Sequence, residues 1–490
     1  MSKNSKKDSS IEGVFVPVIE GFSEILNEKI GLGVNYLAKS LSIPIGGRKN
    51  RNEYLKLTTP MVRSVEQTTD ESALGFAVNY NRAYPLKYLD TSKHVFIVGA
   101  SGWGKTNLLN ILITNAINKG QTVVFIDPKG SRESIKDFIN ICQRLNKSYH
   151  IFSEYHPEAR PFNPLADMTN TQRIELIMRS FDWGDKPNQY YLNEASRALV
   201  EVFKKIAPDQ DRCKVDLHDV LNELKTTHNK EETSGLITQL ELLLTSDFGK
   251  CFKDNHDART MTLKSAWEEK SCVYIGCSTQ GYARIARTVG KMFVSSMMNL
   301  SYQIGRDYSD SHEAMKNGLG LFIDEAGSVL FSDFIDLVNK CRSSGINIYT
   351  AIQSYSDIEM IGGGEVLMKQ LFESYSTWLI QRQSNPENAE KLASAFGTYL
   401  SQKFTIATED GNDSGKGTTR EGYEYYCHPD ILKNIRVGQT LLLSHSPRDH
   451  SLINVRNFRE SSFCKKDTIH TPITESKYKQ NMDQITLGGK

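Results

Sequence analysis

Residues 94–106 read His-Val-Phe-Ile-Val-Gly-Ala-Ser-Gly-Trp-Gly-Lys-Thr, an apolar run of strand type that leads directly into a glycine-rich loop. The loop fits the pattern G-x-x-x-x-G-K-[ST] in full, and residues 107–117 after it carry apolar side chains at helical spacing. Backbone N–H groups of such a loop converge on nucleotide phosphates, the lysine adds a positive charge, and the threonine hydroxyl is a Mg²⁺ ligand. We therefore expect this loop to bind a nucleoside triphosphate. The expected contacts are Gly99, Ala100, Ser101, Gly102, Trp103, Gly104, Lys105 and Thr106.

A second apolar run, at residues 318–323, ends in two carboxylates, Asp324 and Glu325. At the end of a strand beside the phosphate loop, Asp324 is expected near the Mg²⁺ that Thr106 binds. Glu325 is then the natural group to polarise the water that attacks the terminal phosphate. Together the two motifs predict ATP hydrolysis with Mg²⁺ rather than nucleotide binding alone.

Two further polar residues flank the strand expected at residues 347–352. Gln353 follows this strand, where a side-chain amide can contact the γ-phosphate as a sensor. Arg342 precedes it, where a neighbouring subunit could receive the guanidinium as a trans arginine finger. An ordinary strand-end amide and a surface salt bridge are the alternative interpretations, and these residues alone leave both open.

The composition is that of an ordinary globular protein, with 39% hydrophobic residues, 24% charged residues and a net charge of +1 over 490 residues. A chain of this length predicts either two domains or one domain with large insertions. The eight cysteines include no C-x-x-C pair, so we expect no zinc site and free thiols in a reducing compartment. No segment approaches the ~18 consecutive apolar residues of a membrane span, so no intrinsic transmembrane segment is expected.

Short β-branched runs alternate with helical patterns from His94 onward, which predicts an α/β domain with a mostly parallel sheet buried on both faces. The runs lie at residues 122–126, 272–275, 319–323, 347–352, 377–380 and 440–443. Residues 169–263 carry helical patterns without a convincing strand, which favours an all-helical insertion. The expected segments are a disordered N-terminus (1–12), an amphipathic helical segment with linker (13–60), the first part of a P-loop NTPase domain (61–168), the insertion (169–263), the second part (264–456) and a flexible tail (457–490).

Several motifs in chain order resemble the type IV secretion coupling proteins of the TraD/TraG kind, relatives of the FtsK/HerA DNA-pumping ATPases. The resemblance extends from about residue 90 to 445. Its motifs are residues 99–106, 127–130, 162–165, 324–325, 351–354 and 378–382, the last followed by an expected helix at 387–397.

The resemblance implies a RecA-like motor domain with a helical insertion, assembled as a homohexameric ring that cleaves ATP between subunits while DNA passes through its channel. It gives Lys105 and Thr106 the phosphate and Mg²⁺ roles, and Asp324 and Glu325 the metal and water roles. Arg342 and Gln353 fall where the family has its trans arginine and its sensor glutamine. The implied partners are DNA, a relaxase or effector protein, and the type IV secretion apparatus.

The chain departs from that family in two respects. Family members usually begin with a transmembrane pair, so we expect a cytoplasmic protein or one recruited to the inner membrane through a partner, with an N-terminal helix over residues 18–41 as the contact. Trp103 stands where a small residue is usual, and the sequence assigns it no function. Two other functions remain open: a nucleotide-gated receptor (adaptor) for secreted proteins, and a cytoplasmic HerA-like DNA pump.

Overall fold

The structure, a computed structural model, describes most of the chain from Leu57 to Ser462. The described ranges are 57–89, 94–184, 188–209, 215–228, 231–252, 260–307, 317–331, 333–359, 364–409, 412–445 and 448–462. The N-terminal helix expected at 18–41 and the tail beyond residue 462 lie outside these ranges. No helix among the described residues is both long and apolar enough to cross a membrane.

An eleven-stranded sheet runs through the larger of two compact units, in the order β2-β1-β13-β12-β9-β3-β8-β7-β4-β6-β5. The strands from β9 to β5 are parallel, and β12, β13, β1 and β2 continue the sheet with antiparallel pairing. The bounds are β1 Ala73–Ala77, β2 Arg82–Pro85, β3 Val95–Val98, β4 Thr122–Asp127, β5 Tyr149–Phe152, β6 Cys272–Gly276, β7 Leu319–Ile323, β8 Ile346–Ile352, β9 Thr377–Ile380, β12 Gln439–His445 and β13 Arg448–Val455.

The mostly parallel sheet predicted from the short apolar runs is confirmed, since each of the six runs forms a strand. Strands β3, β4, β6 and β7 are buried along their whole length, as strands covered by helices on both faces must be. The run at 440–443 differs in direction, because β12 pairs antiparallel with β9. Strands β1, β2 and β13 were not expected; in β13, polar residues such as His450 and Ser451 break the apolar run.

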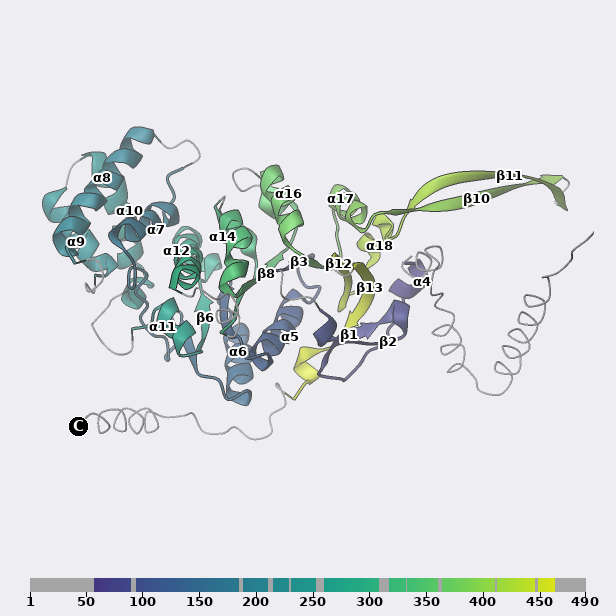
Figure 1. The fold of residues 1–490 in the computed structure, drawn as a ribbon, viewed down its shortest axis with the longest axis horizontal. Helices are drawn as coiled ribbons and strands as arrows, with labels where there is room; N and C mark the ends of the chain where they lie inside the picture. The colour runs from purple at the N-terminus through teal and green to yellow at the C-terminus, as the bar shows by residue number, and fades with distance from the viewer. Residues whose placement is uncertain are drawn as a thin grey trace, which may run out of the picture. The chain divides into compact units, whose positions relative to one another are not determined.

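Helices cover both faces of the sheet (Figure 1). α5 and α6 pack together on one face, whereas α14 contacts both α12 and α16 over the other face. The bounds are α4 Thr59–Val62, α5 Lys105–Asn118, α6 Arg132–Arg144, α11 Leu263–Glu268, α12 Thr279–Asp307, α14 Phe334–Lys340, α15 Ser356–Glu359, α16 Gly364–Ser374, α17 Pro386–Phe396 and α18 Pro429–Asn434.

The described residues between β5 and β6 form helices and no strand longer than an isolated bridge. They include α7 Asn170–Ser180, α8 Gln189–Ile206, α9 Leu217–Thr227 and α10 Ser234–Thr245. Reciprocal capping boxes begin α7 at Thr169 and α9 at Asp216, which satisfies N–H groups that a helix start leaves unpaired. Figure 1 shows these helices gathered on the β6 side of the sheet, opposite β1 and β2.

The second compact unit is described over residues 398–426, which form an antiparallel hairpin of β10 Thr398–Glu409 and β11 Asn412–Tyr425. The sequence gives no clear sign of these strands, because residues 407–419 are rich in Gly, Ser, Thr and Asp, which are typical of turns. The hairpin lies within the stretch that we expected to continue the NTPase domain.

A buried histidine connects the central strands to the helices that cover them. His94, just before β3, accepts a hydrogen bond at Nδ1 from the backbone N–H of Ile348 at 3.0 Å, and its Nε2 donates to the carbonyl of Val338 at 2.9 Å. This pattern requires the neutral imidazole. Burial lowers the pKa of His94 to about 4, and the nearby Arg342 guanidinium acts in the same direction.

We expect His94 to make the fold less stable in mild acid. Because its pKa is about 4 in the folded chain and 6.5 unfolded, the unfolded state binds the proton first as the pH falls below 6.5. As the pH falls from 6.5 to 4, the free energy of unfolding therefore decreases by roughly 3 kcal/mol. Between pH 7 and 4.5 the Tm of His94→Gln should fall less than that of the wild type. His428→Gln, at an exposed site, should follow the wild type; equal losses in both variants would contradict this role.

Candidate nucleotide-binding site

Four loops meet at one edge of the sheet. β3, β8, β7 and β4 are neighbours and parallel, so the residues that follow them lie at the same carboxyl edge. The phosphate loop follows β3, Gln353 follows β8, Asp324 follows β7, and Lys129 follows β4. Sheet hydrogen bonding extends into this edge: Gly99 donates to the Ile352 carbonyl at 3.2 Å.

The loop between β3 and α5 has the backbone of an anion-binding loop. Gly102 and Gly104 have φ of 81° and 97°, a region that favours glycine, and both are on the open side of the loop. α5 begins at Lys105 without a side-chain cap at Gly104, so its first N–H groups are available to a ligand. This arrangement fits the phosphates of a nucleotide.

Lys105 closes over its own loop. Its buried Nζ donates to the carbonyls of Gly99 at 2.7 Å and Ala100 at 3.1 Å. Burial lowers the pKa of the ammonium group, and the charges of Asp324 and Glu325 oppose this shift. An incoming phosphate can replace the two carbonyls as the partner of this ammonium group.

Thr106 and Asp324 approach each other as a pair suited to one Mg²⁺. The Thr106 hydroxyl donates to Oδ2 of Asp324 at 3.3 Å. Burial, together with the neighbouring charges of Asp127 and Glu325, raises the pKa of Asp324 to about 6. Among the described residues no three His, Cys, Asp or Glu side chains gather as a metal-binding group. The hydroxyl oxygen of Thr106 and the carboxylate oxygens of Asp324 are of the type that Mg²⁺ takes when its other ligands are phosphate oxygens and water.

Glu325 contacts two functional side chains through one oxygen. Its Oε1 accepts from Nε2 of Gln353 at 2.6 Å and forms an ion pair with Nζ of Lys129. Burial lowers the pKa of Lys129, but the hydrogen bond and charge of Glu325 outweigh it, so the pKa is raised. Glu325 itself has φ of 42°, in the left-handed region. The carboxylate is thus held next to the loop in a neutralised pair.

Gln353 is fixed by its own backbone as well as by its amide. Oδ2 of Asp357 accepts from the N–H groups of Gln353 at 3.1 Å and Ser354 at 2.9 Å. Gln353 and Glu325, singled out separately in the sequence, are therefore brought together by β8 and β7.

Arg342 lies elsewhere in the same subunit. It is exposed in the 3₁₀ turn Cys341–Ser344, which precedes β8. The seven residues of β8 separate this turn from Gln353 by roughly 20 Å of strand. Arg342 therefore does not join the site of its own chain, and its role as a trans finger stays a prediction.

Three residues of the site were not selected from the sequence. Lys129 was noted only within a strand-end motif, since nothing in the sequence pairs it with Glu325. Gln381, after β9, packs under the loop against Gly99. Arg382 lies with its guanidinium 4.9 Å from the Trp103 ring centroid, and Trp103 Nε1 donates to the Ile435 carbonyl at 3.1 Å. The unusual tryptophan thus joins the loop to the segments after β9 and α18.

Two family models match the chain. The type IV secretion-system coupling protein DNA-binding domain matches residues 83–239, and the TraM recognition site of TraD and TraG matches residues 318–426. A comparison with curated proteins found no match.

Solved structures share the fold. The bacterial conjugative coupling protein TrwBdeltaN70 in its unbound form is 16% identical, covers 84% of this chain and 93% of its own, and has a TM-score of 0.58. The plasmid coupling protein TrwB with ADP and Mg²⁺ is 15% identical, with coverage of 82% and 93% and a TM-score of 0.57. VirB4 of Thermoanaerobacter pseudethanolicus is 15% identical, with coverage of 80% and 98% and a TM-score of 0.54.

We expect Gly99→Ala to weaken ATP binding by roughly tenfold or more. A Cβ at this position would lie 2.5 Å from Cβ of Gln381, so the loop must shift, and overpacking of this kind costs about 1–3 kcal/mol. Titration with a fluorescent ATP analogue measures the affinity. Gly281→Ala, where the added Cβ has open space, is the matched control, and adding Gln381→Gly to Gly99→Ala should restore part of the affinity. Wild-type affinity for Gly99→Ala would refute this account of the loop.

Proposed function

The chain belongs to the type IV secretion coupling proteins, and on that premise we propose that it hydrolyses ATP to move DNA toward a secretion channel. The proposal depends on two hydrogen bonds at one edge of the sheet, which join Thr106 to Asp324 and Gln353 to Glu325. These are the metal, base and sensor positions that phosphoryl transfer needs.

In the proposed reaction a water oxygen attacks the γ-phosphorus and the bond to the β,γ-bridging oxygen breaks. Lys105 and the loop N–H groups bind the phosphates, and Glu325 accepts the proton of the water. Mg²⁺, held by Thr106 and Asp324, would supply positive charge to the phosphate oxygens. Lys129 and Gln353 both contact Oε1 of Glu325, which leaves Oε2 to accept this proton.

We propose a homohexameric ring as the working form, with DNA and a relaxase or effector protein as substrates. The DNA part of this proposal is supported by the match of residues 83–239 to a coupling-protein DNA-binding domain and by relatives described as a conjugative and a plasmid coupling protein. Arg342, exposed and remote from its own site, suits a contact with the nucleotide of a neighbouring subunit.

One alternative is a nucleotide-gated receptor that selects secreted proteins without pumping DNA. The match of residues 318–426 to a protein-recognition region favours it. A cytoplasmic HerA-like DNA pump is the other alternative. Stimulation of the ATPase activity by DNA distinguishes the two DNA-moving functions from the receptor.

Steady-state ATPase activity with and without single- and double-stranded DNA tests the proposal. We expect stimulation by DNA in the wild type and no turnover in Lys105→Ala, which lacks the phosphate-binding charge. Glu325→Gln should bind ATP yet hydrolyse it at least about 100-fold more slowly, because the amide cannot accept the proton. Lys204→Ala, on the exposed face of α8, is the control. Turnover that is indifferent to DNA would favour the receptor.

Arg342→Ala should lose activity only in the assembled ring. A trans finger contributes about 10³-fold or more to turnover, whereas a surface salt bridge contributes almost nothing. The measurement is the ATPase rate of rings mixed from Arg342→Ala and Lys105→Ala subunits. Activity should reappear where an intact site adjoins an intact Arg342. Full activity of Arg342→Ala rings would show that the finger is another residue.

A further inference from the structure

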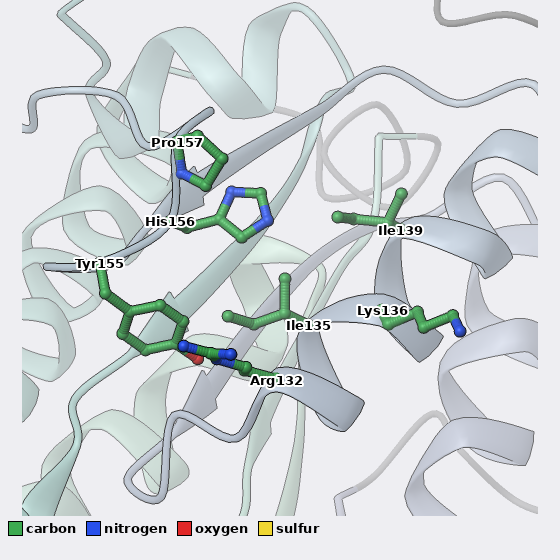
Figure 2. Close-up of a pocket in the computed structure, with 7 residues that line it drawn as sticks. All are labelled: Arg132, Ile135, Lys136, Ile139, Tyr155, His156 and Pro157. Carbon is green, nitrogen blue, oxygen red and sulfur yellow. The ribbon is translucent and has the colours of Figure 1, made fainter.

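A pocket of about 390 Å³ opens between α6 and the residues that follow β5 (Figure 2). The first two turns of α6 contribute Arg132, Ile135 and Lys136, and the loop after β5 contributes Tyr155 and His156. A pocket of this size accommodates a group as large as one nucleotide.

The helix side of the pocket is cationic. Arg132 and Lys136 are exposed and stand one helical turn apart, about 5–6 Å between Cβ atoms. Neither forms an ion pair with another described residue, whereas Glu133 between them is paired with Arg459 at 2.9 Å. The two cations are thus placed to contact an anionic ligand such as a phosphodiester.

The loop side of the pocket presents flat rings. Tyr155 is 38% exposed, the Arg132 guanidinium lies 5.8 Å from its ring centroid, and the His156 ring faces the helix beside Ile135 (Figure 2). Rings interleaved with cations are the arrangement that holds single-stranded nucleic acid, since bases stack on the rings while cations bind the backbone. A peptide of Asp and Glu would use the cations but offers no aromatic ring to stack on Tyr155 or His156.

The pocket is linked to the catalytic carboxylate by one short loop. The Tyr155 hydroxyl donates to the carbonyl of Gly130 at 2.5 Å, and the preceding residue, Lys129, forms the ion pair with Glu325. The loop is tightly packed, because a Cβ on Gly130 would meet Oγ of Ser278 at 2.9 Å. A shift of Tyr155 would therefore move the backbone of Gly130 and of the adjoining Lys129, which forms the ion pair with Glu325.

We propose that this pocket binds one base and the adjoining phosphates of single-stranded nucleic acid, and that its occupancy is transmitted through Tyr155 and Lys129 to Glu325. This inference rests on the proposed DNA motor. It identifies where the motor contacts DNA and how that contact stimulates ATP hydrolysis. All the lining residues lie within the stretch that matches the coupling-protein DNA-binding domain.

The test uses the full chain, a fluorescein-labelled oligothymidylate and an abasic strand of equal length, with affinity measured by anisotropy across a salt series. Arg132→Ala and Lys136→Ala should each weaken binding and reduce the slope of log K against log salt by about 0.7. Lys136→Arg, which keeps the charge, should retain the affinity. Tyr155→Ala and the abasic strand should each bind about tenfold more weakly. Lys204→Ala is the single-charge control.

Transmission is tested separately by Tyr155→Phe, which keeps the ring but lacks the hydroxyl that reaches Gly130. It should bind the oligonucleotide as the wild type does, yet show less than half of the DNA stimulation of ATPase activity.

The outcomes separate this inference from the proposed function. DNA-stimulated hydrolysis with wild-type affinity in the Arg132, Lys136 and Tyr155 alanine variants would overturn the pocket and leave the motor intact. Oligonucleotide binding that depends on these residues, without stimulated hydrolysis, would support the pocket and reject the motor. Equal affinity for the abasic strand would overturn the base contact, and equal affinity for an acidic peptide of the same charge would overturn the nucleic-acid assignment.

Discussion

The parallel alignment of β3, β8, β7 and β4 is the constraint on which the candidate site depends. The register pairs Val98 with Ile352 and Ile323 with Thr350, so the strands end together and deliver their following residues to one edge. The last ladder hydrogen bonds lie inside the site, as when Asp324 donates to the Ile126 carbonyl at 3.0 Å. The catalytic candidates are therefore positioned by the register of the central strands, and a slip of one residue would turn each side chain to the other face.

At this carboxyl edge of the sheet, acidic side chains lie beside lysines. Asp127, Asp324 and Glu325 concentrate negative charge beside two lysines, and each lysine is already engaged. Asp127 accepts from the Tyr274 hydroxyl at 2.6 Å, so its charge is held inside the structure and faces Asp324. Nucleotide and Mg²⁺ together bring charges of both signs, which can replace the internal partners of Lys105 and Asp324 without leaving a buried charge unpaired.

Much of the fold and part of the site could be predicted because their signals are local. The six apolar runs and the loop at Gly99–Thr106 can each be recognised from consecutive residues, and each run forms a strand in the structure. The hairpin β10–β11 was missed because residues 407–419 are rich in Gly, Ser, Thr and Asp, which are typical of turns, although its two strands are neighbours in the chain. The Lys129–Glu325 pair was missed for a different reason, because it joins loops almost two hundred residues apart. Arg342 illustrates the opposite limit: its suggested contact lies in another subunit, so neither the sequence pattern nor a single chain can test it.

Glu325 has a backbone conformation that few side chains adopt. A left-handed φ at a non-glycine residue stores about 1 kcal/mol or more, which the surrounding strand and loop must offset. Selection for folding alone would favour glycine or asparagine there. If Glu325 acts as proposed, this position therefore gives up some folding stability for catalysis.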